Sequence, residues 1–271
     1  MSKPRVLEVD VLVIGSGAAG MTAALKAADL GAKVVIVEKS DRFGGSTAMS
    51  GGVCWVGNNR HMAAAGVPDS DEEVLTYLTN ITGDEGSEPH LRTYRDASKR
   101  MIDWLHEHSH VQFDALGQYT DYYPEAPGGK MGGRSMEPKP FDGSLLGDDF
   151  DLLRRPAASA LVLGKLMITA ALAKRFIAMN FGGLLMMLWL MIKYVLRWPK
   201  RRKLVRDPFL TNGNALAARL WRSCMDREIE LWLSCRLKEL VVDNGRVVGA
   251  MLHHDSNGDA EVFEVRARKG V

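Results

Sequence analysis

The sequence predicts an α/β fold: a doubly wound, mostly parallel sheet with an antiparallel β-meander and a helical insertion. First, the apolar, β-branched run at residues 11–14 is typical of a strand buried on both faces of a parallel sheet. Second, a glycine-rich turn follows this run directly and leads into an Ala-rich helix. Third, DNG and SNGD turns separate apolar segments near the end of the chain, as in β-hairpins.

Composition and charge narrow the class of protein. The chain of 271 residues has 46% hydrophobic and 25% charged residues, which is typical of a soluble globular protein. Its formal net charge is +2, and acidic residues are interspersed with basic ones along most of the chain. We therefore expect no nucleic acid partner.

The cysteines and histidines do not form a recognisable metal site. The chain has three cysteines without a CxxC pair: Cys54, Cys224 and Cys235. His106, His108 and His110 alternate without a carboxylate or cysteine to complete a ligand set, so we expect a solvated helix end there. Together with an N-terminus that shows no signal-peptide pattern, this favours a reduced, cytoplasmic chain without a metal.

The glycine-rich turn has the pattern that binds a diphosphate. Gly15 permits a tight turn, Gly17 lets the backbone approach the diphosphate, and Gly20 lets the following helix pack closely on the strand. That helix, predicted at residues 21–30, directs free N–H groups and a positive dipole end at the phosphates. The residues expected around the diphosphate are Gly15, Ser16, Gly17, Ala18, Ala19 and Gly20.

An acidic residue stands where a dinucleotide site needs one. A second strand is predicted at residues 33–37, and Glu38 follows it, 18 positions after Gly20. A carboxylate there can accept hydrogen bonds from ribose hydroxyls. Strand, turn, helix, strand and acid agree, and this favours a dinucleotide site over a glycine-rich turn of another kind.

The segment from Glu38 to Gly52 resembles that of FAD-dependent oxidoreductases, in which a second glycine pair leads the chain towards the isoalloxazine ring. Over the whole chain, the resemblance is closest to the fumarate reductase and 3-ketosteroid dehydrogenase group, and within it to the ketosteroid Δ1-dehydrogenases. Four stretches carry it: GGSTAMSGGVCWVGNN (44–59), YTDYYPEAPGG (119–129), GGRSMEPKPFDG (132–143) and KELVVDNGRVVG (238–249).

The resemblance implies a Rossmann-like FAD-binding domain. Relatives with covalent FAD carry a histidine in the loop that here spans residues 46–52, and this loop has none, so we expect FAD to bind non-covalently. Backbone near Arg236 and Leu237 is expected to meet the adenine. Besides the glycine turn, the expected cofactor-binding residues are Glu38, Lys39, Gly44, Gly45, Ser46, Thr47, Ser50, Gly51, Gly52, Arg236 and Leu237.

Clustered tyrosines beside Pro and Gly can present phenols to a pocket, each able to donate and accept a hydrogen bond. By the resemblance, Tyr122 assists proton transfer on the substrate side, and Tyr119 and Tyr123 belong to the wall of the substrate pocket. Packing of these rings under the loop is the alternative interpretation.

Two amphipathic helices are predicted at residues 69–82 and 88–107, and a helical insertion at 150–208. Within it, residues 161–196 are expected to be helical, and Asn180 is the one polar side chain of 176–192. Three interpretations stay open: a membrane span, a buried or cap-forming helix pair, and an interfacial helix. In the third, residues 176–203 contact anionic lipid, with Trp189 and Trp198 at the headgroups.

The last part of the chain is predicted to contain a helix and several strands. The helix begins within residues 208–224, and a strand follows at 230–233. The meander is predicted at residues 237–242, 246–253 and 262–267.

By the resemblance, a further buried strand starts at Ala267 and the catalytic domain follows. We therefore expect residues 1–271 to form an incomplete FAD-binding domain, with the catalytic domain absent and an aggregation-prone edge where the strand is missing.

The resemblance implies the oxidation of a hydrophobic 3-ketosteroid-like substrate. A hydride passes from steroid C1 to flavin N5, and a proton is removed at C2 with the help of a tyrosine. The principal base would lie outside this chain, so little activity is expected from it alone, and the electron acceptor is not predicted. One alternative is a fumarate reductase or succinate dehydrogenase-type flavoprotein that acts on another enone or a dicarboxylate. Another is a non-enzymatic, truncated remnant.

Overall fold

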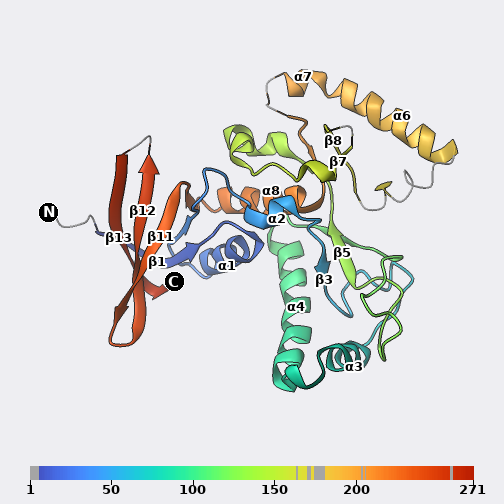
Figure 1. Ribbon diagram of the computed structural model, residues 1–271, viewed down its shortest axis with the longest axis horizontal. Coiled ribbons are helices and arrows are strands. Elements are labelled where there is room, and N and C mark those ends of the chain that lie inside the picture. The colour runs from blue at the N-terminus through green and yellow to red at the C-terminus, as the bar shows by residue number, and fades with distance from the viewer. Residues whose placement is uncertain are drawn as a thin grey trace.

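The computed structural model describes residues 6–162, 164–169, 172–173, 181–202, 204, 206–256 and 259–271. A six-stranded sheet forms its largest element (Figure 1). In spatial order its strands are β10 (Glu230–Trp232), β2 (Val34–Val37), β1 (Val6–Ile14), β13 (Asp259–Gly270), β12 (Arg246–Ser256) and β11 (Cys235–Asp243). The first four run parallel, and β12 and β11 continue the sheet in antiparallel fashion, so the predicted fold class is confirmed.

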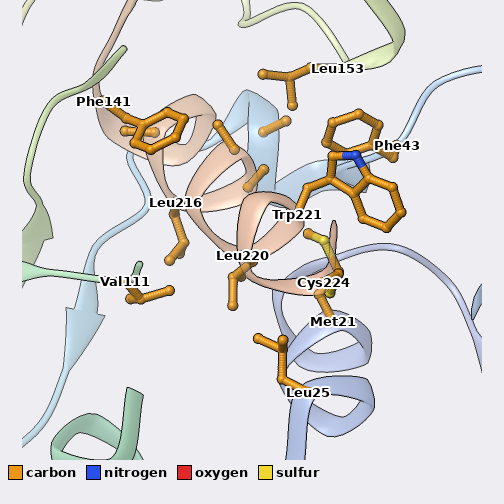
Figure 2. Close-up of a cluster of buried hydrophobic side chains, with 14 of the residues drawn as sticks. Met21, Leu25, Phe43, Val111, Phe141, Leu153, Leu216, Leu220, Trp221 and Cys224 are labelled. Atoms are coloured by element: carbon orange, nitrogen blue, oxygen red, sulfur yellow. The ribbon is translucent and has the colours of Figure 1, made fainter. Parts of the chain in front are cut away.

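Strand β2 is buried along its whole length because both faces of the sheet are covered there. Ile36 packs into the core beneath helices α1 (Ala18–Asp29) and α8 (Asn212–Met225), and Val35 packs into the core on the opposite face. Figure 2 shows Leu220 and Trp221 of α8 in the first of these cores. Helix α8 corresponds to the helix predicted within residues 208–224, and it begins at Asn212, four residues after the predicted start of that range.

Strand β13 contains two strands that were predicted separately. The third meander strand and the buried strand expected from Ala267 onward are both part of β13, which pairs with β12 on one side and with β1 on the other. The strand expected from Ala267 is therefore present as the end of β13, which lies between β12 and β1. Figure 1 shows the long strands of the meander and β1 side by side.

A second, smaller part of the fold lies around helices α3 (Asp71–Thr82) and α4 (Glu88–His108). Ser70 caps α3 by accepting a hydrogen bond from the N–H of Glu73 at 3.2 Å, and the first turn carries three acidic residues. A 3₁₀ turn, η1 (Gly83–Glu85), joins the helices, and beside α4 lies a small sheet in the order β3 (Cys54–Trp55), β5 (Ser135–Pro138) and β4 (Phe113–Ala115).

The end of α4 corrects one prediction in part, since His108 and His110 are exposed as expected but His106 is partly buried. The His106 ring lies 4.7 Å from that of His61, and its Nε2 accepts a hydrogen bond from the N–H of Phe113 at 3.0 Å. Burial lowers the pKa of His106 to about 4. No cluster of metal-ligating residues occurs in the described part of the chain.

The remaining elements connect the two parts. Helix α2 (Gly45–Met49) lies against α8, and short strands β6 (Phe141–Asp142) and β9 (Phe209–Leu210) pair with each other. The 3₁₀ segments are η2 (Gly143–Leu152) and η3 (Ala158–Ala160).

The insertion is less helical than predicted. Residues expected to begin a helix at 161 instead form a hairpin of β7 (Leu161–Val162) and β8 (Leu166–Met167), because Gly164 adopts a φ of +68° in the turn. Helix α6 (Phe181–Leu196) and the short α7 (Trp198–Arg201) follow, and residues 174–180 lie outside the described residues. Among the helices described, none has the length and apolarity needed to cross a membrane.

Candidate cofactor site

The turn between β1 and α1 depends on two glycines. Gly15 has a φ of +102°, a left-handed conformation that favours glycine. A Cβ at Gly20 would overlap the carbonyl oxygen of Gly15 and approach Cγ1 of Val13 to 3.2 Å. Helix α1 can start this close to β1 because position 20 has no side chain.

Glu38 ties the end of β2 to this turn. Its buried carboxylate accepts hydrogen bonds from Ser16, at 3.0 Å from the backbone N–H and 2.7 Å from the hydroxyl, and from the N–H of Ser40 at 3.0 Å. Burial raises the pKa of Glu38, but the hydrogen bonds from Ser16 and Ser40 outweigh it and the pKa lies below its usual value. The carboxylate is therefore ionised and fixed in place.

The second glycine pair lies directly against the turn. Gly44 has a φ of +103°, and its N–H donates to the Ser16 hydroxyl at 3.1 Å. The Thr47 hydroxyl accepts a hydrogen bond from the N–H of Ala18 at 3.0 Å, at the start of α1. The two glycine-rich segments thus form one hydrogen-bonded unit, as their separate motifs imply.

Helix α8 supports this unit from behind, through residues that the sequence analysis missed. The side-chain amide of Asn214 donates to the carbonyl of Ala48 at 2.6 Å, and a Cβ at Gly213 would overlap the carbonyl of Thr47. The NGN triplet ahead of the Ala-rich segment could have indicated these contacts. A buried asparagine needs hydrogen-bond partners, and a glycine permits another backbone to approach closely.

A cavity of about 590 Å³ opens beside the turn. Eight of the residues predicted to bind the cofactor line it: Gly15, Gly17, Glu38, Lys39, Gly45, Ser46, Arg236 and Leu237. Five other lining residues were not predicted: Ile14, Val37, Ser40, Arg154 and Cys235. The cavity thus joins the first turn, the end of β2, the second glycine pair and the start of β11.

The other predicted cofactor residues do not line this cavity: Ser16, Ala18, Ala19, Gly20, Gly44, Thr47, Ser50, Gly51 and Gly52. Ser50 instead holds the segment after α2 against α8. The backbone carbonyl of Ser50 accepts the N–H of Gly213 at 3.0 Å, and the Ser50 hydroxyl accepts the N–H of Gly52 at the same distance.

The tyrosine loop lies against α3, apart from the cofactor cavity. Tyr122 is 90% exposed, Tyr119 49% and Tyr123 56%, and none of the three lines that cavity. The N–H of Tyr123 donates to the hydroxyl of Tyr77 in α3 at 3.3 Å. The structure thus does not bring these phenols to the cofactor cavity, and their roles stay a prediction.

A buried ionic network fixes this loop. The guanidinium of Arg134 is fully buried and makes two hydrogen bonds of 2.8 Å to Asp69 and one of 3.0 Å to Asp121. Burial opposes the charge of Arg134, but its bonds to Asp69 outweigh this and raise its pKa. Asp121 also accepts the indole N–H of Trp55 at 2.7 Å, so the DYY element is anchored by its aspartate.

Comparison with known families agrees with this geometry. The sequence model described as "FAD binding domain" matches residues 10–271. The chain belongs to this FAD-binding domain family. The family supports FAD as the dinucleotide that the glycine turn predicts.

Two curated relatives and one solved structure are similar over nearly the whole chain. A 3-oxosteroid 1-dehydrogenase of Mycolicibacterium smegmatis is 38% identical over 97% of this chain. A 4-oxocyclohex-2-ene-1-carboxylate 5-dehydrogenase of Sinomonas cyclohexanicum is 34% identical over 98%. The 3-ketosteroid Δ1-dehydrogenase of Sterolibacterium denitrificans, solved in complex with 1,4-androstadiene-3,17-dione, matches 96% of the chain with 38% identity and a TM-score of 0.89.

These matches extend over only part of each relative. The chain spans 46% of the Mycolicibacterium protein, 44% of the Sinomonas protein and 46% of the Sterolibacterium structure. The chain is thus homologous to FAD-dependent dehydrogenases over about half their length.

Two glycine substitutions are expected to have different effects. Gly20→Ala should lower the free energy of unfolding by about 1–3 kcal/mol, because the new Cβ overlaps the backbone carbonyl of Gly15.

At Gly17 the nearest atom to a new Cβ is the Thr47 hydroxyl at 3.6 Å, so Gly17→Ala should change the free energy of unfolding by less than about 1 kcal/mol. FAD affinity should still fall about 10-fold, since the methyl group enters the path of the diphosphate. Urea unfolding and FAD fluorescence titration measure the two effects, and equal effects at both sites would contradict this.

Arg134→Met should destabilise the protein by roughly 3–5 kcal/mol, because it leaves the buried Asp69 and Asp121 carboxylates without their cation. Arg92→Met is the matched control, since Arg92 forms an exposed pair with Glu88 and should cost less than about 0.5 kcal/mol. Chemical denaturation monitored by tryptophan fluorescence measures both, and similar losses would show that the buried network is not special.

Proposed function

We propose that this chain binds FAD non-covalently and supplies the cofactor site of a dehydrogenase that oxidises a CH–CH bond beside the ketone of a steroid-like substrate. The observation that carries the proposal is the cavity in which residues from both glycine-rich segments, Glu38 and the start of β11 meet. The similarity to 3-oxosteroid 1-dehydrogenases supports the substrate class.

The start of α1 fits the diphosphate of FAD. Its N-cap residue, Gly17, makes no capping side-chain hydrogen bond, and its first turn contains no acidic residue. Helix α3 differs, since Ser70 caps it and three acids neutralise its positive end. The Thr47 hydroxyl accepts one N–H there, and an anion bound at α1 would supply the negative charge that the first turn lacks, for which Gly17 leaves room.

Each part of the site has a separate task in this proposal. The glycine turn and the N-terminus of α1 bind the diphosphate, Glu38 has acceptor capacity left for a ribose hydroxyl, and the backbone near Arg236 and Leu237 meets the adenine. FAD, when bound, supplies the acceptor for the hydride from steroid C1. Tyr122, exposed at the tip of the anchored loop, assists removal of the proton at C2.

A smaller cyclic enone is the second candidate substrate. The Sinomonas relative is named for an oxocyclohexene carboxylate, and it is nearly as similar to this chain as the steroid enzymes are. Both candidates contain a ring ketone beside the bond that is oxidised. They differ in size and in charge, so a competition between the two compounds distinguishes them.

The absorbance spectrum tests the function. After FAD addition and desalting, the purified chain should retain oxidised flavin, and anaerobic addition of a 3-ketosteroid should bleach it slowly, because the principal base is expected outside this chain. Tyr122→Phe should retain FAD but bleach about 100-fold more slowly still, since it lacks the phenol that assists the proton transfer. Tyr194→Phe, a change in α6 at a residue that lines a different cavity, is the control. Loss of flavin on desalting would contradict the cofactor proposal, and retained but unbleached flavin would contradict dehydrogenation by this chain.

We further propose that α6 contacts a membrane surface that holds the hydrophobic substrate. Most large apolar side chains of this helix are exposed, among them Leu184, Leu188 and Trp189, whereas Leu190 is buried. The ammonium group of Lys193 lies 3.7 Å from the centre of the Trp189 ring, which places a cation beside an indole. This combination is typical of an interfacial helix on anionic lipid.

Binding to vesicles tests this contact. The chain should sediment with anionic vesicles at low salt, and the double variant L184E/L188E should bind at least about 10-fold more weakly, because each change removes an exposed leucine and adds negative charge. Leu30→Glu alters an exposed leucine at the end of α1 and should bind normally. Equal binding of all three proteins, or none by the unmodified chain, would overturn the proposal.

A further inference from the structure

The cofactor cavity carries an excess of positive charge. The charged residues that line it are one acid, Glu38, and three cations, Lys39, Arg154 and Arg236. The lining thus has two more positive than negative charges. The diphosphate of a dinucleotide carries two negative charges, so the cavity matches it in sign and amount.

Two of the three cations lie at one end of the cavity, and the third comes from another segment. Lys39 follows Glu38 at the end of β2, and Arg236 is the second residue of β11, so both belong to the end proposed for the adenosine. Arg154 comes from the segment after η2, and its backbone N–H donates to the carbonyl of Phe43 at 2.9 Å. Arg154 is therefore the cation beside the second glycine pair.

The position of Arg154 is fixed on both sides of its Cα. The carbonyl of Arg154 accepts a hydrogen bond of 3.2 Å from the Asn214 amide, and the same amide donates to Ala48 at 2.6 Å. Asn214 thereby ties Arg154 to α2, which begins at Gly45. The backbone of residue 154 is held against the segment that borders the diphosphate end of the cavity.

The side chain of Arg154 has no protein partner in the part of the chain that the structure describes, although the residue is partly buried. Two nearby arginines have protein partners: Arg42 donates to the carbonyl of Asp151, and Nη1 of Arg206 donates to Asn214 at 2.9 Å, although Nη2 of Arg206 is buried without a partner among the described residues. A partly buried cation without a partner is stabilised when a ligand supplies the anion.

We propose that Arg154 is a cofactor-binding residue whose guanidinium pairs with the diphosphate of FAD. This inference rests on the proposed FAD site and adds to it a charge that neither glycine motif contains. The next residue offers a control, because Arg155 is exposed and lines a different cavity together with Met167 and Tyr194.

Binding by the purified full chain tests the assignment, with FAD, ADP and riboflavin as separate probes. Arg154→Gln should bind FAD and ADP about 10- to 100-fold more weakly, and riboflavin, which lacks phosphate, with unchanged affinity. Arg154→Lys should recover part of the loss, since it restores a point charge without the planar guanidinium. Arg155→Gln should bind all three like the unmodified chain.

The outcomes separate this inference from the cofactor proposal. If the unmodified chain binds neither FAD nor ADP, both fail. If it binds FAD and Arg154→Gln binds equally well, or loses riboflavin affinity to the same extent, only the role of Arg154 is wrong. Circular dichroism and urea unfolding of the ligand-free variants check folding, and Arg154→Lys remains informative if the glutamine variant does not fold.

Discussion

The close crossing of α1 over the end of β1 is the constraint on which the rest of the site depends. It exists because Gly20 has no side chain beside the carbonyl of Gly15. Since α1 lies this close, its face can pack against α8, as Figure 2 shows for Met21 and Leu25. Helix α8 in turn approaches α2 at Gly213, where a side chain would overlap the carbonyl of Thr47. The close approach at Gly20 thus lets α1 and α8 pack together, and α8 in turn contacts the second glycine-rich segment.

Glu38 shows how one side chain serves structure and ligand binding together. Its carboxylate holds Ser16 and Ser40, yet a carboxylate has about four acceptor positions and these bonds use three. The low pKa keeps the group ionised, so the turn is fixed before any ligand arrives. A rigid site binds its ligand more tightly because less conformational entropy is lost on binding.

The sequence was informative where residues belong to a motif of known spacing and less so where contacts follow no such motif. The glycine turn and Glu38 could be predicted because they belong to one motif, in which the acid follows the second strand 18 positions after Gly20. The Asp69–Arg134–Asp121 network could not, since its members are separated by at least 13 positions and nothing local pairs them. The helix expected from residue 161 failed because Gly164 turns an apolar, helix-compatible run into a hairpin. Arg154 was missed because its neighbours, Phe43 and Asn214, are remote in sequence.

A short segment links the second glycine pair to the tyrosine loop. At one end, the carbonyl of Ser50 accepts the N–H of Gly213, and a Cβ at Gly52 would come within 2.7 Å of the same backbone nitrogen. At the other end, Trp55 in β3 donates to Asp121, the anchor of the tyrosine loop. Residues 50–55 therefore connect α8 and the second glycine pair to the loop that carries Tyr122. Because both ends of this segment are held by short contacts, a shift of α8 would move the second glycine pair and the tyrosine loop together.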